Sequence, residues 1–415
     1  MTLRNSPSLR SVFRLDRCQS RRHVALFSFL FAAASLSCSE DETVRLPYSG
    51  EAYPARTIAA LPKRGAFVTN SYSDTISVID RDTGTLAVNI PVGRDPVGLD
   101  GPHHTVLLGT DLYVPLSYPS TGAASGPHAA HANSARAGYL LRVPLSTFVP
   151  TASVRLRENP GDVILSEDQS HILVSHFDLK RASNQLLPID SRRATLGIFP
   201  SNFADGDDGR MVTVCAAPHG IVSIGNFAYT ACYGEDAIAK VNLDTQEVTR
   251  FYFAGGNEPP SEPTVGPYAF FRESVASPRI AVSNTLSKNV RFFDTATDRF
   301  EAGSLSTTGA PYLGASDANL ANHRGWVVAQ TPDEIVAFDW TTGAVTQKRT
   351  FADGECPFPH EVSQDPTSGD LYVVCEGDKK APGKLVILSP ETFATKVTID
   401  VGVYPDKLIF FGDAQ

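Results

Sequence analysis

Hydrophobic and polar residues alternate in short runs along most of the chain after its first 50 residues. Within residues 66–100, the runs AFVTN, TISVID and LAVNIPV are rich in β-branched residues and are separated by Ser, Asp, Thr and Gly. Such runs, bounded by turn residues, predict β-strands. Similar strand–turn–strand phrases recur at 237–256, 289–304, 334–351 and 384–402. No long segment keeps a helical apolar period, so we expect almost no helix beyond residue 50.

A proline opens each of these phrases and sets their period. The eight markers are Pro54, Pro96, Pro160, Pro218, Pro267, Pro311, Pro359 and Pro405, and they enclose intervals of 42, 64, 58, 49, 44, 48 and 46 residues. Repeats of about 40–45 residues with four strands each are typical of β-propeller blades. We therefore predict an all-β fold, a seven-bladed β-propeller of four-stranded antiparallel blades. Residues 55–61 and 406–411 are both candidates for the innermost strand of the first blade, where one of them would close the ring.

The first phrase also resembles a known repeat. The stretch AFVTNSYSDTISVIDRDTGTLAVNIPVGRDPVG resembles the YVTN repeat, the unit of a seven-bladed β-propeller family of exported bacterial proteins. The later units match it in rhythm and partly in residues, and the resemblance covers residues 54–411. It implies a propeller with a central channel, but no particular activity, because this fold hosts many functions.

The start of the chain has the composition of an export signal. Six arginines precede the apolar run 24–36, which ends at Ser37 and Cys38 and is too short for a typical membrane span. The break resembles a bacterial lipobox, which implies that Cys38 is lipidated; ordinary signal cleavage and a retained anchor are the alternatives. We assign 1–37 to a lipoprotein-type export signal, 38–50 to a tether and 51–415 to the propeller. The expected location is the bacterial cell envelope, as a periplasmic or outer-membrane lipoprotein whose only membrane attachment is this anchor.

The charge balance argues against one class of partner. Removal of residues 1–37 takes away six arginines and one aspartate, which leaves 30 basic and 44 acidic side chains and a formal charge of −14. A chain this acidic, with no basic run, is disfavoured as a binder of phosphate backbones. We therefore expect no nucleic-acid partner.

Two units carry a cysteine three residues before the opening proline and another at the end of the second strand. These cysteines are Cys215 and Cys232 in one unit, and Cys356 and Cys375 in the other. Because the first two strands of a blade are antiparallel, the end of the second lies beside the start of the first. In an exported protein this predicts the disulfides Cys215–Cys232 and Cys356–Cys375. A thiolate metal site and free thiols are the alternatives.

The residue after each opening proline forms a column that should line one mouth of the channel. Four consecutive units place His219, Tyr268, Tyr312 and His360 there, whereas the first three place Ala55, Val97 and Gly161, and Asp406 follows the last proline. One interpretation is a one-sided ligand-binding site, to which His176, His128 and His131 would contribute from loops on the same face. The alternative is a water-filled channel whose lining varies freely. No cofactor is predicted, although a transition metal at this mouth is possible because imidazole binds such ions.

The remaining candidates have simpler interpretations. His103 and His104 fall in a lengthened hairpin and are predicted to lie on the surface, as are His171 and His323 in turns. Asp162, Asp317 and Glu361 lie near strand starts, where a hydrogen-bonding role is expected. The sequence contains no G-x-S-x-G, H-E-x-x-H or C-x-x-C-H motif and no Walker lysine.

Without a dense carboxylate or histidine cluster in the sequence, we expect a non-catalytic binding or scaffold protein, acting as a monomer. Its partner would be an envelope protein, a glycan or a small organic ligand. The alternative is a metal-dependent or lactonase-like enzyme, or a redox accessory, that uses the channel mouth.

Overall fold

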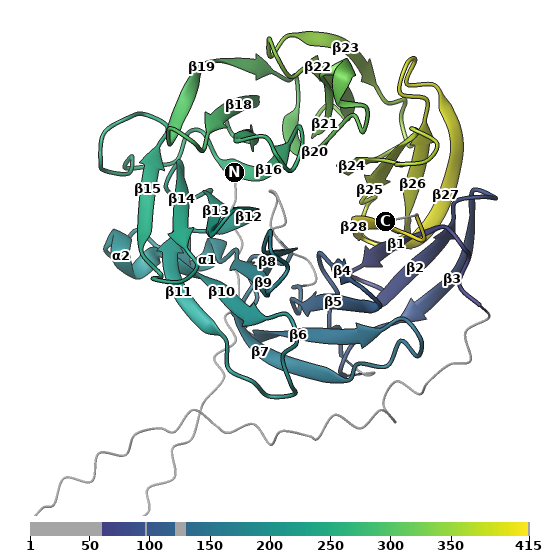
Figure 1. Cartoon of the computed structure of the whole chain (residues 1–415), viewed down its shortest axis with the longest axis horizontal. Helices are drawn as coiled ribbons and strands as arrows, with labels where there is room; N and C mark the ends of the chain where they lie inside the picture. Colours follow the sequence, from purple (N-terminus) through teal and green to yellow (C-terminus); the bar gives the residue numbers. More distant parts are fainter. Residues whose placement is uncertain (1–59, 96–97, 121–129, 414–415) are drawn as a thin grey trace, which may run out of the picture. The chain divides into compact units, whose positions relative to one another are not determined.

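The computed structural model describes residues 60–95, 98–120 and 130–413. These residues form seven four-stranded antiparallel sheets arranged in a ring, as Figure 1 shows. The predicted seven-bladed β-propeller is confirmed. The predicted export signal, the tether and Cys38 lie outside the described residues.

The first three blades contain the N-terminal strands and the last strand of the chain. In order from the ring centre outwards, blade 1 consists of β28 (Pro405–Phe411), β1 (Gly65–Asn70), β2 (Thr75–Asp80) and β3 (Thr85–Pro91). Blade 2 consists of β4 (Val106–Leu108), β5 (Asp111–Leu116), β6 (Ala137–Pro144) and β7 (Ala152–Glu158). Blade 3 consists of β8 (Pro160–Leu165), β9 (His171–His176), β10 (Ala194–Pro200) and β11 (Arg210–Cys215).

Each of the other four blades, like blades 2 and 3, consists of four consecutive strands of the chain. Blade 4 consists of β12 (Pro218–Ile224), β13 (Phe227–Cys232), β14 (Ala237–Asn242) and β15 (Val248–Tyr252). Blade 5 consists of β16 (Pro267–Arg272), β17 (Arg279–Asn284), β18 (Asn289–Asp294) and β19 (Arg299–Ser306). Blade 6 consists of β20 (Ala310–Ser316), β21 (Arg324–Gln330), β22 (Glu334–Asp339) and β23 (Val345–Thr350). Blade 7 consists of β24 (Pro359–Gln364), β25 (Leu371–Cys375), β26 (Pro382–Leu388) and β27 (Thr395–Val403).

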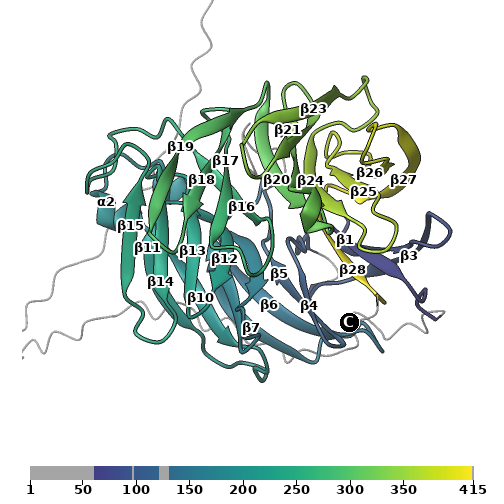
Figure 2. The same ribbon diagram turned by 45° about the horizontal axis from the view of Figure 1, so that its top comes forward.

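The C-terminal strand closes the ring. Strand β28 pairs with β1, so residues from the two ends of the described chain share blade 1. Figure 2, the same ring turned by 45°, shows the two strands side by side next to blade 7. Of the two candidate segments, 406–411 therefore supplies the innermost strand of this blade.

Neighbouring blades are held together by apolar side chains from both faces of each sheet. In β1, Phe67 packs with residues of blade 2 such as Val114, whereas Ala66 and Val68 pack with residues of blade 7 such as Val374. Because both faces of β1 are buried, both sets of alternating positions are apolar, which explains why the polar alternation along this strand is incomplete.

Helix is confined to three short segments in the described part of the chain: α1 (Leu179–Ala182), α2 (Ile189–Arg192) and the 3₁₀ helix η1 (Leu320–Asn322). The first two lie between β9 and β10, within the 58-residue interval between Pro160 and Pro218, which is longer than the period of a typical blade. Among the described residues, no helix has the length and apolar character needed to cross a membrane.

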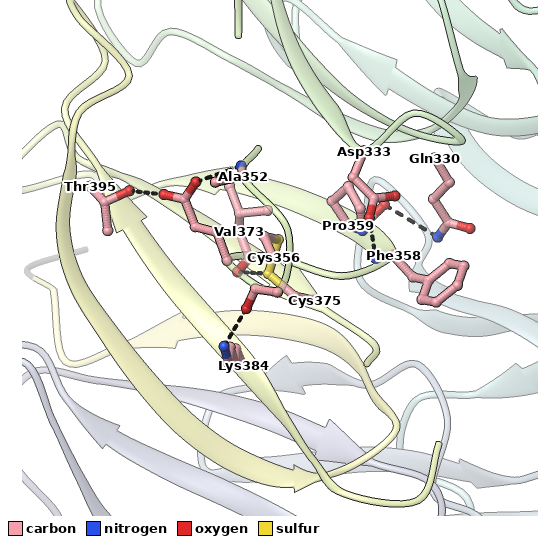
Figure 3. Close-up of a disulfide and its surroundings, with 12 residues drawn as sticks. Gln330, Asp333, Ala352, Cys356, Phe358, Pro359, Val373, Cys375, Lys384 and Thr395 are labelled. Carbon is pink, nitrogen blue, oxygen red and sulfur yellow. Dashed lines mark hydrogen bonds between the residues drawn. A yellow bond between two sulfur atoms is a disulfide. The ribbon is translucent and has the colours of Figure 1, made fainter. Parts of the chain in front are cut away.

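Both predicted disulfides are present, with Cα atoms 5.7 Å apart for Cys215–Cys232 and 5.1 Å apart for Cys356–Cys375. The first bridge joins the last residue of β11 in blade 3 to the end of β13 in blade 4, and the second joins the segment before β24 to the end of β25 in blade 7. Figure 3 shows the second bridge, together with the hydrogen bond from the Phe358 backbone N–H to Asp333 and that from Gln330 to the Pro359 carbonyl. These contacts fix the segment that enters β24.

The opening prolines mark a recurrent local structure. The residue before Pro160, Pro218, Pro359 or Pro405 has a positive φ, between 50° and 57°. The pairing of the first strand with the second then shifts register immediately after the proline, at Pro218/Ile221 and Pro359/Glu361 for example. A β-bulge bends its strand and redirects the side chains beside it. This bulge is the feature that positions the residues following each proline.

Candidate active site at the ring centre

We call the residue directly after each opening proline the first column. Its predicted members His219, Tyr268, Tyr312 and His360 lie on the innermost strands of blades 4 to 7 and come together in the structure. His219 stacks on Tyr268 with ring centroids 4.0 Å apart, and Tyr312 lies 5.1 Å from Tyr268 and 5.5 Å from His360. All four are buried, with at most 5% of any of them exposed. They form a packed group and not the water-filled lining that was the alternative.

Blade 2 shows an error in the predicted register. Its innermost strand is preceded by Pro102, which pairs with Leu116 as Pro218 pairs with Cys232. The first-column residue of blade 2 is therefore His103, and the prediction of Val97, which lies outside the described residues, is wrong. The sequence contained the signal, because Pro102 precedes Leu116 by 14 residues, as Pro218 precedes Cys232, whereas Pro96 precedes it by 20.

The surface assignment of His103 and His104 is therefore also wrong, since both are buried. The His103 ring lies 4.6 Å from that of His104, and His104 lies 5.6 Å from His219 and 5.9 Å from His360. His104 thus occupies the space between two histidines that belong to blades on different sides of the ring. The lengthened hairpin suggested exposure, but the bulge after Pro102 turns both rings inwards.

We call the next residue in each blade the second column. Blades 7, 1, 2 and 3 place charged or titratable side chains there, namely Glu361, Lys407, His104 and Asp162, whereas blades 4 to 6 place Gly220, Ala269 and Leu313. The first column is polar or aromatic in every blade except blade 3, which has Gly161. The one-sided character expected of the first column is therefore found in the second.

The charged residues of the second column form two pairs between adjacent blades. His104 Nδ1 lies 2.6 Å from Asp162 Oδ1, and Lys407 Nζ lies 2.9 Å from Glu361 Oε1. Each carboxylate also accepts a backbone N–H from the next blade, that of Ile221 for Asp162 and that of Leu408 for Glu361. The predicted hydrogen-bonding role of both acids is confirmed, and these bonds hold the pairs in fixed positions.

His131 reaches the same place from the long connection between β5 and β6. Its ring stacks on His103 at 4.0 Å and on Tyr404 at 5.1 Å, and it is buried. Asp406, the first-column residue of blade 1, lies between several of these rings, with Oδ2 2.7 Å from His103 Nε2 and Oδ1 3.7 Å from His104 Nε2. The ring-centre cluster, as we name it from here on, comprises His103, His104, His131, Asp162, His219, Tyr268, Tyr312, His360, Glu361, Asp406 and Lys407.

One glycine makes room for this cluster. A Cβ atom at Gly161 would lie 2.9 Å from Ser175 Oγ and 3.3 Å from His219 Cδ2. Contacts that short would force the His219 ring or the Ser175 hydroxyl to move. The small residue that the sequence places in blade 3 is thus required by its neighbour.

His176 is not part of the cluster, although the sequence suggested that it would contribute. It lies at the end of β9, where Nδ1 is 2.9 Å from the Thr195 carbonyl and Nε2 accepts the Arg157 backbone N–H at 3.1 Å. Its binding role therefore has no support from the geometry. His128 lies outside the described residues, and His171 and His323 are partly or largely exposed, as predicted.

Burial and neighbouring charges shift the pKa values of His104 and Asp162 in opposite directions. Burial lowers the pKa of His104, but the carboxylates of Asp406 and Asp162 outweigh it, so this pKa stands above its ordinary value. Burial likewise raises the pKa of Asp162, but His104 outweighs it and brings that pKa down to about 2. The pair therefore favours an imidazolium beside a carboxylate.

Three other histidines of the cluster are held in the neutral form. Burial lowers the pKa of His360 to about 3, and lowers the pKa values of His219 and His131 well below the ordinary range. Lys407 behaves like His104. Burial lowers its pKa, but the carboxylates of Glu361 and Asp162 outweigh this effect, so its pKa is raised and the ammonium stays charged. Strongly perturbed groups gathered at one place are typical of functional sites.

Two sets of side chains in the cluster could hold a metal ion. His103, His131 and Asp406 form one set, and His104, His360 and Asp406 form the other; within each, the candidate ligand atoms lie within 4.8 Å of one another. His219 belongs to neither set. The cluster thus offers neutral imidazoles, carboxylates and a buried cation within a few ångströms, which suits both proton transfer and metal binding.

Comparison with known proteins identifies the fold. No protein-family model and no curated protein matches the sequence. The periplasmic gluconolactonase PpgL of Pseudomonas aeruginosa superimposes with a TM-score of 0.60 and 15% identity, over 84% of this chain and 98% of its own. A putative 6-phosphogluconolactonase of Bacteroides uniformis gives 0.58 and 14%, over 84% and 100%. The dihydro-heme d1 dehydrogenase NirN gives 0.52 and 12%, over 87% and 81%. At this identity the likeness establishes the seven-bladed propeller, and membership of the YVTN family stays a prediction.

These findings overturn the expectation of a non-catalytic binding or scaffold protein. That expectation depended on the absence of a dense histidine and carboxylate cluster, and the ring centre contains one. The similar structures, moreover, are named as two lactonases and a dehydrogenase. The enzymatic alternative is therefore the one to develop. The disulfides, and the periplasmic location of one similar protein, agree with export.

Proposed function

We propose that this protein is an exported hydrolase of small lactones, with its reaction centre in the ring-centre cluster. The observation that carries the proposal is the His104–Asp162 pair, in which Nδ1 and the carboxylate oxygen are 2.6 Å apart in a buried setting. A carboxylate that holds a histidine in one tautomer is the arrangement used by catalytic general bases. The gluconolactonase names of two similar structures support the choice of substrate class.

The cluster supplies each group that ester hydrolysis requires. In the neutral form of His104, Nδ1 keeps the hydrogen that it donates to Asp162. Nε2 then has the lone pair that would take a proton from the attacking water, which gives the imidazolium that the neighbouring carboxylates favour. The water oxygen would bond to the lactone carbonyl carbon, and the charge that develops on the carbonyl oxygen would be stabilised by the Lys407 ammonium. Cleavage of the ring C–O bond, with return of the proton to the leaving oxygen, gives the hydroxy acid.

The uneven distribution of charge in the second column would orient a bound substrate. Charged groups occupy blades 7, 1, 2 and 3, whereas Gly220, Ala269 and Leu313 leave the other side apolar. A small organic substrate with one polar carbonyl would direct that group to the charged side. We further propose that the protein acts as a monomer at the cell envelope, tethered through lipidated Cys38.

The test is hydrolysis of glucono-1,5-lactone, followed by acid release at constant pH and corrected for the uncatalysed rate. We expect catalysis by the wild-type protein, a loss of about 10²–10⁴-fold in kcat for His104→Gln, and a similar loss for Asp162→Asn. His176→Asn is the matched control, because that histidine is equally buried but lies outside the cluster. A wild-type rate equal to the uncatalysed one with this and other small lactones would refute the proposal.

A further inference from the structure

Five histidines of the ring-centre cluster are oriented in the same way: each turns Nδ1 towards an oxygen atom. The distances are 3.0 Å from His103 to the Pro160 carbonyl, 3.2 Å from His219 to the Tyr268 carbonyl, 3.0 Å from His360 to the Asp406 carbonyl, 2.6 Å from His104 to Asp162 Oδ1, and 2.6 Å from His131 to Ser117 Oγ. In three of these, the carbonyl belongs to the next blade of the ring. The propeller itself therefore fixes the orientation of the imidazoles.

This orientation decides the tautomer. A carbonyl oxygen can only accept, so Nδ1 of His103 carries the hydrogen, and in the neutral ring Nε2 carries the lone pair. His131 follows the same logic, because the Ser117 hydroxyl lies 3.0 Å from the Gly101 carbonyl and donates to it. The serine oxygen is thereby left to accept from His131 Nδ1. Both histidines consequently present Nε2 as a ligand atom.

These two lone pairs converge on a carboxylate. His103 Nε2 lies 2.7 Å from Asp406 Oδ2, and one ligand atom each from His103, His131 and Asp406 lies within 4.8 Å of the others. All three side chains are at most 1% exposed. Nitrogen lone pairs and a carboxylate oxygen repel one another at such distances unless a positive charge lies between them.

We propose that this charge is a divalent transition metal ion, of the Zn²⁺ class, bound by His103, His131 and Asp406. Two imidazole nitrogens and one carboxylate oxygen are a borderline-soft ligand set, which suits Zn²⁺ and its neighbours better than Mg²⁺ or Ca²⁺. Three protein ligands leave a position for a further ligand. The oxygen bonded to each Nδ1 is the outer contact that metal-binding histidines normally make.

The second candidate set is less suitable. The atom of His360 nearest to Asp406 Oδ1 is Nδ1, at 3.2 Å, and this nitrogen already donates to the Asp406 backbone carbonyl. The nitrogen near the carboxylate therefore carries a hydrogen, and the other nitrogen, Nε2, lies 3.3 Å from the Tyr268 hydroxyl, which can donate to it. His104 Nε2 is 3.7 Å from the same oxygen, and Nδ1 of His104 is committed to Asp162. We assign the ion to the first set and leave His104 as the proposed base.

The inference goes beyond lactone hydrolysis and is tested without it, by metal content. The full-length protein is treated with a chelator, incubated with Zn²⁺, separated from free ion and analysed by mass spectrometry of the metal. We expect about one zinc per chain for the wild type and a decrease of at least about 10-fold for Asp406→Asn and for His131→Ala. Co²⁺ in place of Zn²⁺ should give the visible absorption of a low-coordinate site, and this signal should be lost in the same variants.

Two further variants separate a metal site from a merely structural cluster. Ser117→Ala removes the outer contact of His131 and should weaken zinc affinity about 10–100-fold while stoichiometry at saturation is retained. His176→Asn, a buried histidine outside the cluster, should bind zinc like the wild type. Circular dichroism checks that each variant is folded. Wild-type protein that takes up no zinc and no cobalt, or a folded Asp406→Asn variant that binds zinc as the wild type does, would overturn the assignment, and a shared proton between His103 and Asp406 would then account for the contact.

Discussion

The ring centre and the blade sheets that surround it, which we call the wall, both contain buried histidines. The histidines have different partners in the two regions. His176 in the wall bonds to the protein through both nitrogens, with Nδ1 facing the Thr195 carbonyl and Nε2 accepting from the Arg157 backbone. His103 at the centre is anchored at Nδ1 by the Pro160 carbonyl, and its Nε2 faces the side-chain carboxylate of Asp406. Burial of a histidine therefore says little about its role, and the partner of the second nitrogen says a great deal.

The difference follows from position in the blade. The end of the second strand lies within a sheet, where neighbouring strands supply backbone donors and acceptors to both sides of a ring. The start of the first strand lies at the axis, where a bulge turns side chains of different blades towards one another. Groups from blades that are not neighbours can meet only there, so convergent chemistry is concentrated at the ring centre.

The largest effect that we predict tests whether the centre is packed as firmly as the wall. Tyr312→Ala should lower the free energy of unfolding by about 3–5 kcal/mol, because the side chain is only 5% exposed and contacts Tyr268 and His360. Tyr312→Phe, which keeps the ring, should lose less than about 1 kcal/mol. Urea unfolding measures both. Equal stability of Tyr312→Ala and the wild type would mean that the centre is solvated, as one interpretation of the sequence required.

The next largest effect concerns the two disulfides of the wall. Replacing both cysteines of either disulfide with serine should cost about 3 kcal/mol in the loop-entropy model, since the sequence separations of 17 and 19 residues are nearly equal. Urea unfolding of the variants Cys215→Ser/Cys232→Ser and Cys356→Ser/Cys375→Ser gives the two values. Unchanged stability in either variant would show that the bridge in question contributes nothing under the conditions used.

The sequence predicted the scaffold well because the scaffold is local and repeated. Strand phrases, turn residues and regular prolines recur in each unit, so an error in one blade does not change the number of blades. The cysteine pairs were predictable for the same reason, because Cys215 precedes Pro218 by three residues and Pro218 pairs with Cys232 in the antiparallel ladder of β12 and β13. Only the ring closure required the structure, which places β28 beside β1.

The site was predicted only in part because it depends on the register of each blade. His219, Tyr268, Tyr312 and His360 were found from one column, but choosing Pro96 in place of Pro102 hid His103 and His104. The contacts between blades, such as that of His104 with Asp162, join residues that no repeat pattern links. His131 comes from the long connection between β5 and β6; the sequence placed it on the same face, but no repeat pattern gives its contacts with His103 and Tyr404. A single register error thus concealed the histidines that make the cluster dense, which is why the enzymatic interpretation stood second to a binding or scaffold role.

A smaller effect is the pH dependence of stability that His176, the neutral histidine of the wall, should cause. Burial lowers the pKa of His176 to about 4, from about 6.5 in the unfolded chain. Between these values the unfolded state binds more protons than the folded state, so the stability that His176 permits at neutral pH is lost as the pH falls. The loss from this residue should be about 2 kcal/mol between pH 7.5 and pH 5. The difference in unfolding free energy between the wild type and His176→Asn should therefore shrink or change sign over that range, and a difference that is constant with pH would contradict the prediction.

The smallest effect is expected for a histidine that belongs to neither region. His323 Nδ1 lies 2.7 Å from Glu273 Oε1, but the histidine side chain is 54% exposed. Exposed ion pairs contribute only about 0–1 kcal/mol, because water solvates both groups and salt screens them. His323→Gln should accordingly change the free energy of unfolding by less than about 1 kcal/mol at pH 6, and less still in 0.5 M salt. A larger loss that persists at high salt would show that this contact is structural, and that a short distance to a carboxylate matters even without the burial that sets the ring-centre histidines apart.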